Sequence, residues 1–235
     1  MNTATKYIGI NQRVPFQVLD QGLIRFLQTG MVDKGEIKQD MREFTKGENR
    51  VSKASLYANQ ILTRPKALLD LISKMDFETY VKLPENERKA FVLALFAITY
   101  PIAHDLLIAM AKGYKAQPQI NKKFISLKLS ALYGSNRTLD IAIDALLPML
   151  IELKTIQRAK RSIYELAPSY FITSPIVTEA YIYTDIFLSG SKSALVENLR
   201  SGPWYSFYSV DYHPGIHKNL LKFSEGKIGG GYISI

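Results

Sequence analysis

The chain contains no cysteine among its 235 residues, which excludes disulfide bonds and thiolate metal ligands. It has three histidines, and two of them, His213 and His217, stand four residues apart. That spacing suits one helix face, but Pro214 and Gly215 lie between them and disfavour a helix. We therefore expect neither a metal site nor a cofactor. The lack of cysteine is compatible with a reducing compartment, and we expect a cytoplasmic protein.

Long apolar runs are also scarce. The first six residues lack the charged and apolar regions of a signal peptide. The longest apolar run covers residues 90–100 and continues over 101–110, where a proline, a histidine and an aspartate interrupt it. A membrane-spanning helix needs about 20 mostly apolar residues. The run therefore predicts a pair of buried core helices, and we expect no membrane partner.

Catalytic signatures are missing as well. The sequence has no phosphate-binding glycine-lysine loop, no dinucleotide fingerprint, no nucleophile elbow and no zinc-protease helix. Residues 229–231 are three glycines with no helix expected after them, which predicts a hinge. Asp70, Asp76 and Glu78 are scattered near expected helix ends, whereas a nuclease needs clustered carboxylates to hold its metal. We expect no enzyme, and a metal-dependent nuclease is a less favoured alternative because such a cluster can form in space.

The first 114 residues predict a helical bundle, because apolar residues recur there with helical spacing between proline, glycine and aspartate boundaries. The expected helices run from Pro15 to Gly30, from Asp33 to Gly47, from Ser52 to Pro65, from Ala67 to Met75, from Pro84 to Tyr100, and from Pro101 to Gly113. The body of the fifth, residues 90–99, is apolar on all sides, which is typical of a central buried helix.

The stretch from Lys122 to Leu166 has the pattern of a winged helix-turn-helix. An apolar-periodic segment over residues 124–133 is followed by a turn at 134–136 and a second periodic segment over 139–150. Residues 153–160 and 163–166 then flank a turn at Arg161-Ser162, and the second of these segments alternates with the period of a strand. Helix, turn, helix and basic hairpin follow one another as in that DNA-binding unit. We expect it to occupy residues 115–168.

Positive charge gathers in the same region. The chain carries a net charge of +9, and residues 112–165 hold ten basic and four acidic residues. Residues two apart share a strand face, so Arg158 and Lys160 are predicted to point the same way along DNA phosphates. The expected contacts with double-stranded DNA are Arg158, Lys160, Arg161, Lys122, Lys123, Arg137, Asn136 and Thr138. The alternative is a hairpin edge that charge keeps soluble.

The second helix of the unit is less typical of DNA binding. Asp140 and Asp144 lie four residues apart and repel phosphate, and Pro148 is expected to kink the helix. This helix therefore reads DNA through its first turn only, or it serves a protein contact.

Residues 169–235 form the third expected unit, an aromatic-rich α/β extension that contains twelve aromatic side chains. Residues 180–188 fit a helix or a strand equally well, and 191–200 favour a helix. Trp204, Tyr205, Phe207 and Tyr208 suit two roles. They could stack on exposed bases, or they could form a core or docking patch, which we favour.

Several apolar and basic positions resemble the BrxA family of BREX phage-defence systems. They are Leu150-x-x-Leu153-x-x-Ile156-x-Arg158, then Tyr164-x-Leu166-x-Pro168, and Ala58-x-x-Ile61-x-x-Arg64 followed by Leu68 and Leu69. The resemblance covers roughly residues 15–170, and the residues after Ser169 depart from it. It implies a small, non-enzymatic DNA-binding component of a bacterial defence island, with other proteins of a defence complex as partners. The alternative is an adaptor that docks through its aromatic C-terminal region.

Overall fold

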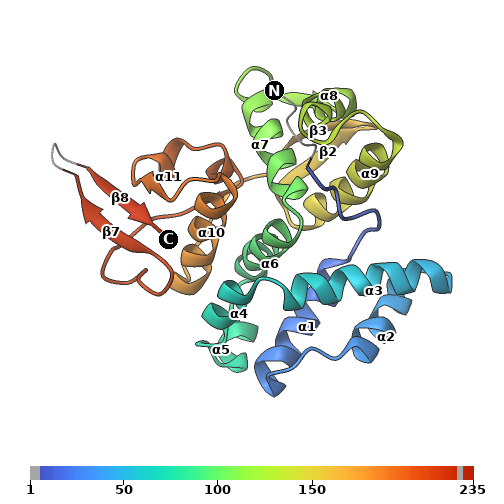
Figure 1. Cartoon of the computed structure of the whole chain (residues 1–235), viewed down its shortest axis with the longest axis horizontal. Coiled ribbons are helices and arrows are strands. Elements are labelled where there is room, and N and C mark those ends of the chain that lie inside the picture. Colours follow the sequence, from blue (N-terminus) through green and yellow to red (C-terminus); the bar gives the residue numbers. More distant parts are fainter. Residues whose placement is uncertain (1–5, 227–229) are drawn as a thin grey trace.

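The computed structural model describes residues 6–226 and 230–235 of the chain. Within this part helices predominate, and the strands form three small sheets (Figure 1). The expectation of a mainly α-helical protein with a small β component is therefore confirmed.

Helix α6 (Glu85–Thr99) lies at the centre of the molecule (Figure 1). Its residues from Lys89 to Ala97 are all buried. It packs against α1 (Phe16–Thr29), α3 (Glu48–Thr63), α7 (Ile102–Tyr114) and α10 (Pro175–Leu188). A helix that is apolar all round is stable only when neighbours cover it all round, and this arrangement provides that cover.

The N-terminal helices follow the expected order, with one addition. Helix α2 (Lys34–Phe44) begins at Asp33, whose side chain accepts a hydrogen bond of 2.8 Å from the Glu36 backbone N–H. Pro65 separates α3 from α4 (Lys66–Ile72). Sequence analysis missed the short helix α5 (Phe77–Lys82), which Asp76 caps in the same way as Asp33 caps α2.

The next elements follow the order expected for a winged helix-turn-helix. After α7 come β1 (Gln119–Asn121), α8 (Lys122–Tyr133), α9 (Arg137–Glu152), β2 (Ile156–Lys160) and β3 (Ile163–Leu166). The strands make an antiparallel sheet in the order β1-β3-β2. Helix α7 packs against both α8 and β1, so it serves as the first helix of the unit. The boundary expected at residue 115 falls between α7 and β1, and it stays a prediction.

The C-terminal region corrects one expectation and resolves another. The helix expected over 191–200 is wrong, because β5 (Ser193–Leu195) pairs with β8 (Gly231–Ser234) and only α11 (Asn198–Ser201) is helical. Backbone pairing with distant residues thus overrides the local pattern. Residues 180–188, which fitted either element, belong to α10. The glycine hinge lies partly outside the described residues, and Gly231 begins a strand.

The remaining elements complete this region. Strand β4 (Tyr170–Phe171) pairs in parallel with β6 (Tyr208–Ser209), and β7 (Lys222–Glu225) pairs with β8. A short 3₁₀ helix, η1 (Trp204–Ser206), follows α11.

The aromatic cluster of the C-terminal region is core. Trp204, Tyr205, Phe207 and Tyr208 are each at most 6% exposed. The Trp204 ring lies between the rings of His104 and Tyr181, with centroid distances of 4.9 and 4.8 Å. Because all four side chains are buried, they cannot stack on exposed bases. Burial of such large apolar surfaces stabilises the fold more than exposure to water would.

Two buried carboxylates fix the C-terminal region: Glu87 ties it to α6, and Glu179 ties two of its own segments together. Glu87 of α6 accepts hydrogen bonds from the backbone N–H and hydroxyl of Thr173 and from the Ser174 backbone N–H, at 2.6 to 3.2 Å. Glu179 of α10 accepts from Asn219 at 2.8 Å and from the backbone of the adjoining segment. Buried charges need such partners, so each carboxylate fixes the position of the segment that it binds.

The apolar run over residues 90–110 is divided between α6 and α7. Within the described residues, no single helix combines the length and hydropathy of a membrane span. Helices α6 and α7 meet those criteria only when taken together, and they are bent by 113° at their junction.

We predict that Leu93→Ala in α6 lowers the free energy of unfolding by about 2–5 kcal/mol, because it leaves a cavity beneath helices on every side. The same exchange at Leu127, which is 69% exposed, should change stability by no more than about 0.5 kcal/mol. Urea unfolding of both variants measures the difference. Equal losses would show that α6 is not the centre of the core.

Candidate nucleic-acid interface

Two asparagines begin the helices of the helix-turn-helix. The Asn121 side chain accepts a 2.8 Å hydrogen bond from the Phe124 backbone N–H at the start of α8. Asn136 accepts one of 3.0 Å from Leu139 at the start of α9. Both residues occupy the capping position where asparagine is preferred. Between the helices, Gly134 has a φ of 76°, which allows the tight turn.

The wing is tied to the start of α8. The turn at Arg161-Ser162 connects β2 and β3 as expected, and Ser162 adopts a φ of 61°. The Ser162 carbonyl accepts a 2.9 Å hydrogen bond from the Lys122 backbone N–H, and Ile163 pairs with Asn121 across the sheet. The wing tip is therefore held directly beside the first turn of α8.

This contact brings four cationic side chains to one corner, which we call the basic corner: Lys122, Lys123, Lys160 and Arg161. Lys122 is partly buried and pairs with Asp144 of α9 at 2.6 Å. The other three are exposed, and no ion pair with a described residue involves them. The corner thus presents a net positive charge to solvent.

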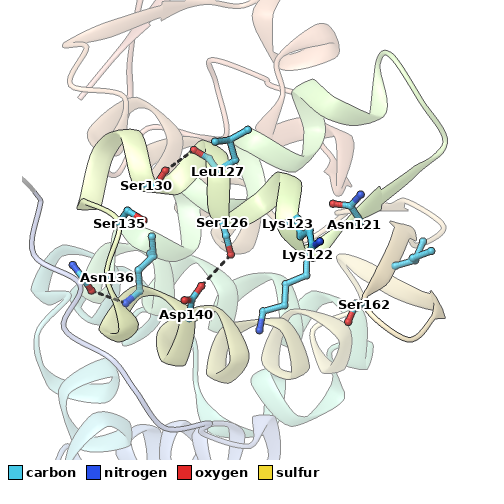
Figure 2. A pocket seen from close by; sticks show the side chains of 12 residues that line it. Asn121, Lys122, Lys123, Ser126, Leu127, Ser130, Ser135, Asn136, Asp140 and Ser162 are labelled. Atoms are coloured by element: carbon cyan, nitrogen blue, oxygen red, sulfur yellow. Dashed lines mark hydrogen bonds between the residues drawn. The ribbon is translucent and has the colours of Figure 1, made fainter.

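A groove of about 910 Å³ extends from the basic corner between α8 and α9 (Figure 2). Lys122 reaches across it toward α9, and Ser162 lies at its wing end (Figure 2). Ser135 and Asn136 close the opposite end. The Ser126 hydroxyl of α8 donates a 3.3 Å hydrogen bond to the Asp140 carboxylate of α9 and so joins the two walls of the groove.

Arg158 does not share a face with Lys160, and that prediction is wrong. Arg158 pairs with Tyr164 and Lys160 with Ile163, because the register shifts between them. Cross-strand partners share a face, and the consecutive residues Tyr164 and Ile163 lie on opposite faces. The bulge therefore turns Arg158 toward α9, where its guanidinium lies 5.9 Å from the centre of the Tyr164 ring.

The other predicted contacts lie at the start of α9. Arg137 and Thr138 are exposed in its first turn. Thr138 lines a second, smaller pocket of about 430 Å³ with the extended N-terminal segment, and Asn136 borders both this pocket and the groove. Of the eight predicted residues, the groove itself contains Lys122, Lys123 and Asn136.

Sequence analysis missed three residues of this surface, Asn121, Leu127 and Ser162, and the exposure of Ile141 on α9. Asn121 could have been found, since an asparagine three residues before an apolar-periodic segment is a helix-cap signal. Ser162 contributes only a backbone carbonyl, which no side-chain pattern reveals. Leu127 and Ile141 are 69% and 41% exposed although they look like core residues in an apolar period. The packing of α8 and α9 determines which side of each helix faces solvent, and both side chains lie on that side.

His213 and His217 lie beside each other, with ring centroids 6.2 Å apart. Within residues 6–226 and 230–235, no group of three or more His, Asp or Glu side chains is placed to hold a metal ion. The Nδ1 atom of His217 accepts a 3.0 Å hydrogen bond from the His213 backbone N–H. Burial lowers the pKa of His217, which favours this neutral accepting form.

The element order and the β1-β3-β2 sheet match the pattern expected for a winged helix-turn-helix. Comparison of the chain with models of protein families, with curated proteins and with solved structures finds no match.

We predict that Ser162→Gly raises the free energy of unfolding by about 1 kcal/mol, since glycine adopts a positive φ without steric cost. The matched exchange Ser135→Gly, in the exposed turn before α9, should not stabilise the protein. Thermal unfolding of both variants tests this. A destabilised Ser162→Gly protein would mean that the serine side chain, and not only its carbonyl, holds the wing.

Proposed function

We propose that the protein binds double-stranded DNA through the basic corner and the adjoining groove, without strong sequence preference. The carrying observation is the 2.9 Å hydrogen bond between Lys122 N–H and the Ser162 carbonyl, which places the wing tip beside the first turn of α8. Four cations then meet on one exposed surface of a helix-turn-helix unit. Lysine and arginine at such a surface bind phosphates, which position a protein on DNA without reading its sequence.

Helix α9 contributes mainly its first turn. Asn136, Arg137 and Thr138 are exposed there and can donate hydrogen bonds to phosphates or base edges. Further along, Asp140 and Asp144 repel phosphate. Asp144 is neutralised by Lys122, and such exposed ion pairs contribute only about 0–1 kcal/mol, so the lysine can exchange its partner for a phosphate.

Arg158 is left out of the proposed contacts, because it lies on the strand face opposite Lys160. We also propose that the protein belongs to a bacterial phage-defence system, as the resemblance to the BrxA family implies. We propose a non-enzymatic role for it in that system. The DNA-binding experiment below tests neither the phage-defence role nor the non-enzymatic role.

We predict that Lys160→Ala/Arg161→Ala weakens DNA binding and flattens its salt dependence. Each phosphate contact releases counterions and contributes about 0.9 to the slope of log K against log salt, so two lost contacts should lower the slope by about 1.8. Gel shifts of one duplex at several salt concentrations measure it. The charge-matched control is Lys53→Ala/Lys66→Ala, two exposed residues of α3 and α4, which should retain the wild-type slope.

Absence of any shift by the wild-type protein at low salt would contradict the proposal outright. A double variant that keeps the wild-type affinity and slope would show that the wing is only a solvated edge. In contrast, Arg158→Ala should leave the slope unchanged.

We predict that Asp144→Asn tightens DNA binding severalfold. The exchange keeps the shape of the side chain but removes the charge that repels phosphate and holds Lys122 at 2.6 Å. The freed lysine should add one phosphate contact and raise the salt slope by about 0.9. Asp40→Asn on α2 changes the net charge equally and should have no such effect. Equal behaviour of the two variants would place Lys122 outside the contact.

A protein-docking role for the helix-turn-helix is the second candidate, and the exposed side chains of Leu127 and Ile141 favour it. Together with Asp140 they give the α8–α9 surface apolar and acidic character that DNA does not require. This candidate predicts that Leu127→Ser/Ile141→Ser abolishes co-purification with a partner and leaves the gel shift intact.

A further inference from the structure

A further groove, of about 810 Å³, lies between α7 and α8, and we call it the α7–α8 groove. The two helices run antiparallel, since the Tyr133 hydroxyl at the end of α8 donates a 2.6 Å hydrogen bond to Asp105 in the first turn of α7. Among the described residues, none lines both this groove and the one that adjoins the basic corner. An occupant of the α7–α8 groove therefore contacts a different surface from the one proposed for DNA.

Apolar and small side chains form most of the lining. Ile108 of α7 and Phe124 of α8 are half-buried, and Leu132 of α8 is 41% exposed. Ala116 and Ala131 are exposed and leave room above the backbone of the two helices. An apolar surface that is open to water and bordered by charged residues is typical of a site for another macromolecule.

The charged residues at the border are cationic. Lys112 of α7 and Lys128 of α8 stand on opposite walls, and both are exposed. No ion pair with a described residue involves either of them. The Lys128 Nζ atom lies 5.5 Å from the centre of the Phe124 ring, so one cation is held directly beside the apolar lining.

The carboxylate in the lining does not cancel this charge. Asp105 stands at one end of the groove, where it pairs with Lys6 at 2.8 Å and accepts the hydrogen bond from Tyr133. Its charge is therefore already compensated by a lysine outside the lining. The α7–α8 groove presents a net positive charge on both sides of an apolar floor.

We infer that the α7–α8 groove binds an amphipathic helix of a partner protein, one that carries acidic residues on both sides of its apolar stripe. The apolar stripe packs on Ile108, Phe124 and Leu132, and the carboxylates meet Lys112 and Lys128. From Phe124 to Leu132 the wall formed by α8 is about 12 Å long, eight residues at about 1.5 Å each. That length accommodates a little more than two turns of a helix, with apolar anchors spaced three and four residues apart.

The floor distinguishes this occupant from other polyanions. Duplex DNA offers phosphates to the two lysines, but its phosphate backbone has no apolar ridge to fill the groove. A bilayer with anionic headgroups presents a flat surface, which does not enter a groove between two helices. A helix with leucines between glutamates supplies both the ridge and the charge, and complementary charge of this kind favours one partner over others.

Fluorescence anisotropy of the full chain with labelled synthetic peptides tests this inference. The probe is a peptide of about four helical turns with leucines on one face and glutamates on both sides of that face. It should bind saturably, with one site per chain. A peptide of the same composition in which the leucines do not share a face should bind at least about tenfold more weakly, as should a peptide with lysine in place of each glutamate.

The lysines have a charge-matched control. Lys112→Ala/Lys128→Ala should weaken binding of the acidic peptide by about tenfold, because an exposed ion pair contributes at most about fivefold in affinity. Lys53→Ala/Lys66→Ala removes the same charge from α3 and α4 and should change the affinity by less than about twofold, because these exposed lysines lie outside the groove. Urea unfolding of both variants checks that the fold is unchanged.

The floor has a matched control on the same helix. Leu132→Ser lies in the α7–α8 groove and should weaken binding of the acidic peptide at least about fivefold, since it removes apolar contact area. Leu127→Ser lies in the groove on the α9 side of α8 and should leave that binding unchanged. The opposite result, loss at Leu127 and none at Leu132, would place the docking surface between α8 and α9.

Three other results would overturn the inference. They are no binding of the acidic peptide by the wild type at millimolar concentration, equal binding of all three peptides, and wild-type affinity in Lys112→Ala/Lys128→Ala. A lower salt slope of DNA binding in that double variant would assign the two lysines to DNA instead. Peptide binding does not require DNA binding, so a wild type that shifts no duplex would contradict the proposed function alone.

Discussion

The structure depends on the need to cover α6 on every side. Residues 90–97 of α6 have no polar face and cannot be exposed to water, so α1, α3, α7 and α10 must all pack on this helix. That requirement fixes the position of α7, and α7 in turn carries the winged unit through its contacts with α8 and β1. The candidate DNA surface is therefore anchored to the core of the bundle.

The same constraint places the C-terminal region. Helix α10 reaches α6 from the side opposite the N-terminal helices, and Glu87 binds the backbone just before it. The hydrophobic core is therefore continuous through the N-terminal helices, the helix-turn-helix region and the C-terminal region. Helix α7 and the C-terminal region touch through the rings of His104 and Trp204.

The basic corner shows how a backbone contact creates a surface. Lys122 and Arg161 are 39 positions apart, and neither is drawn to the other by charge. The ladder between β1 and β3, extended by the hydrogen bond to the Ser162 carbonyl, holds them together. Because backbone pairing holds the corner together, Lys123, Lys160 and Arg161 remain available to bind an anion, and solvent screens the repulsion between them.

The sequence by itself determined the predominance of helix, the boundaries at Pro65, Pro84 and Pro101, and the helix-turn-helix with its basic hairpin. These features depend on local periodicity, helix capping and turn residues, which involve only residues close together in the sequence. Only the tertiary structure decided the side of the sheet to which Arg158 turns, because a bulge breaks the alternation that sequence assumes. It also decided that residues 193–195 form a strand and that the aromatic cluster is core. Those outcomes depend on contacts between residues far apart in the chain, which no local pattern records.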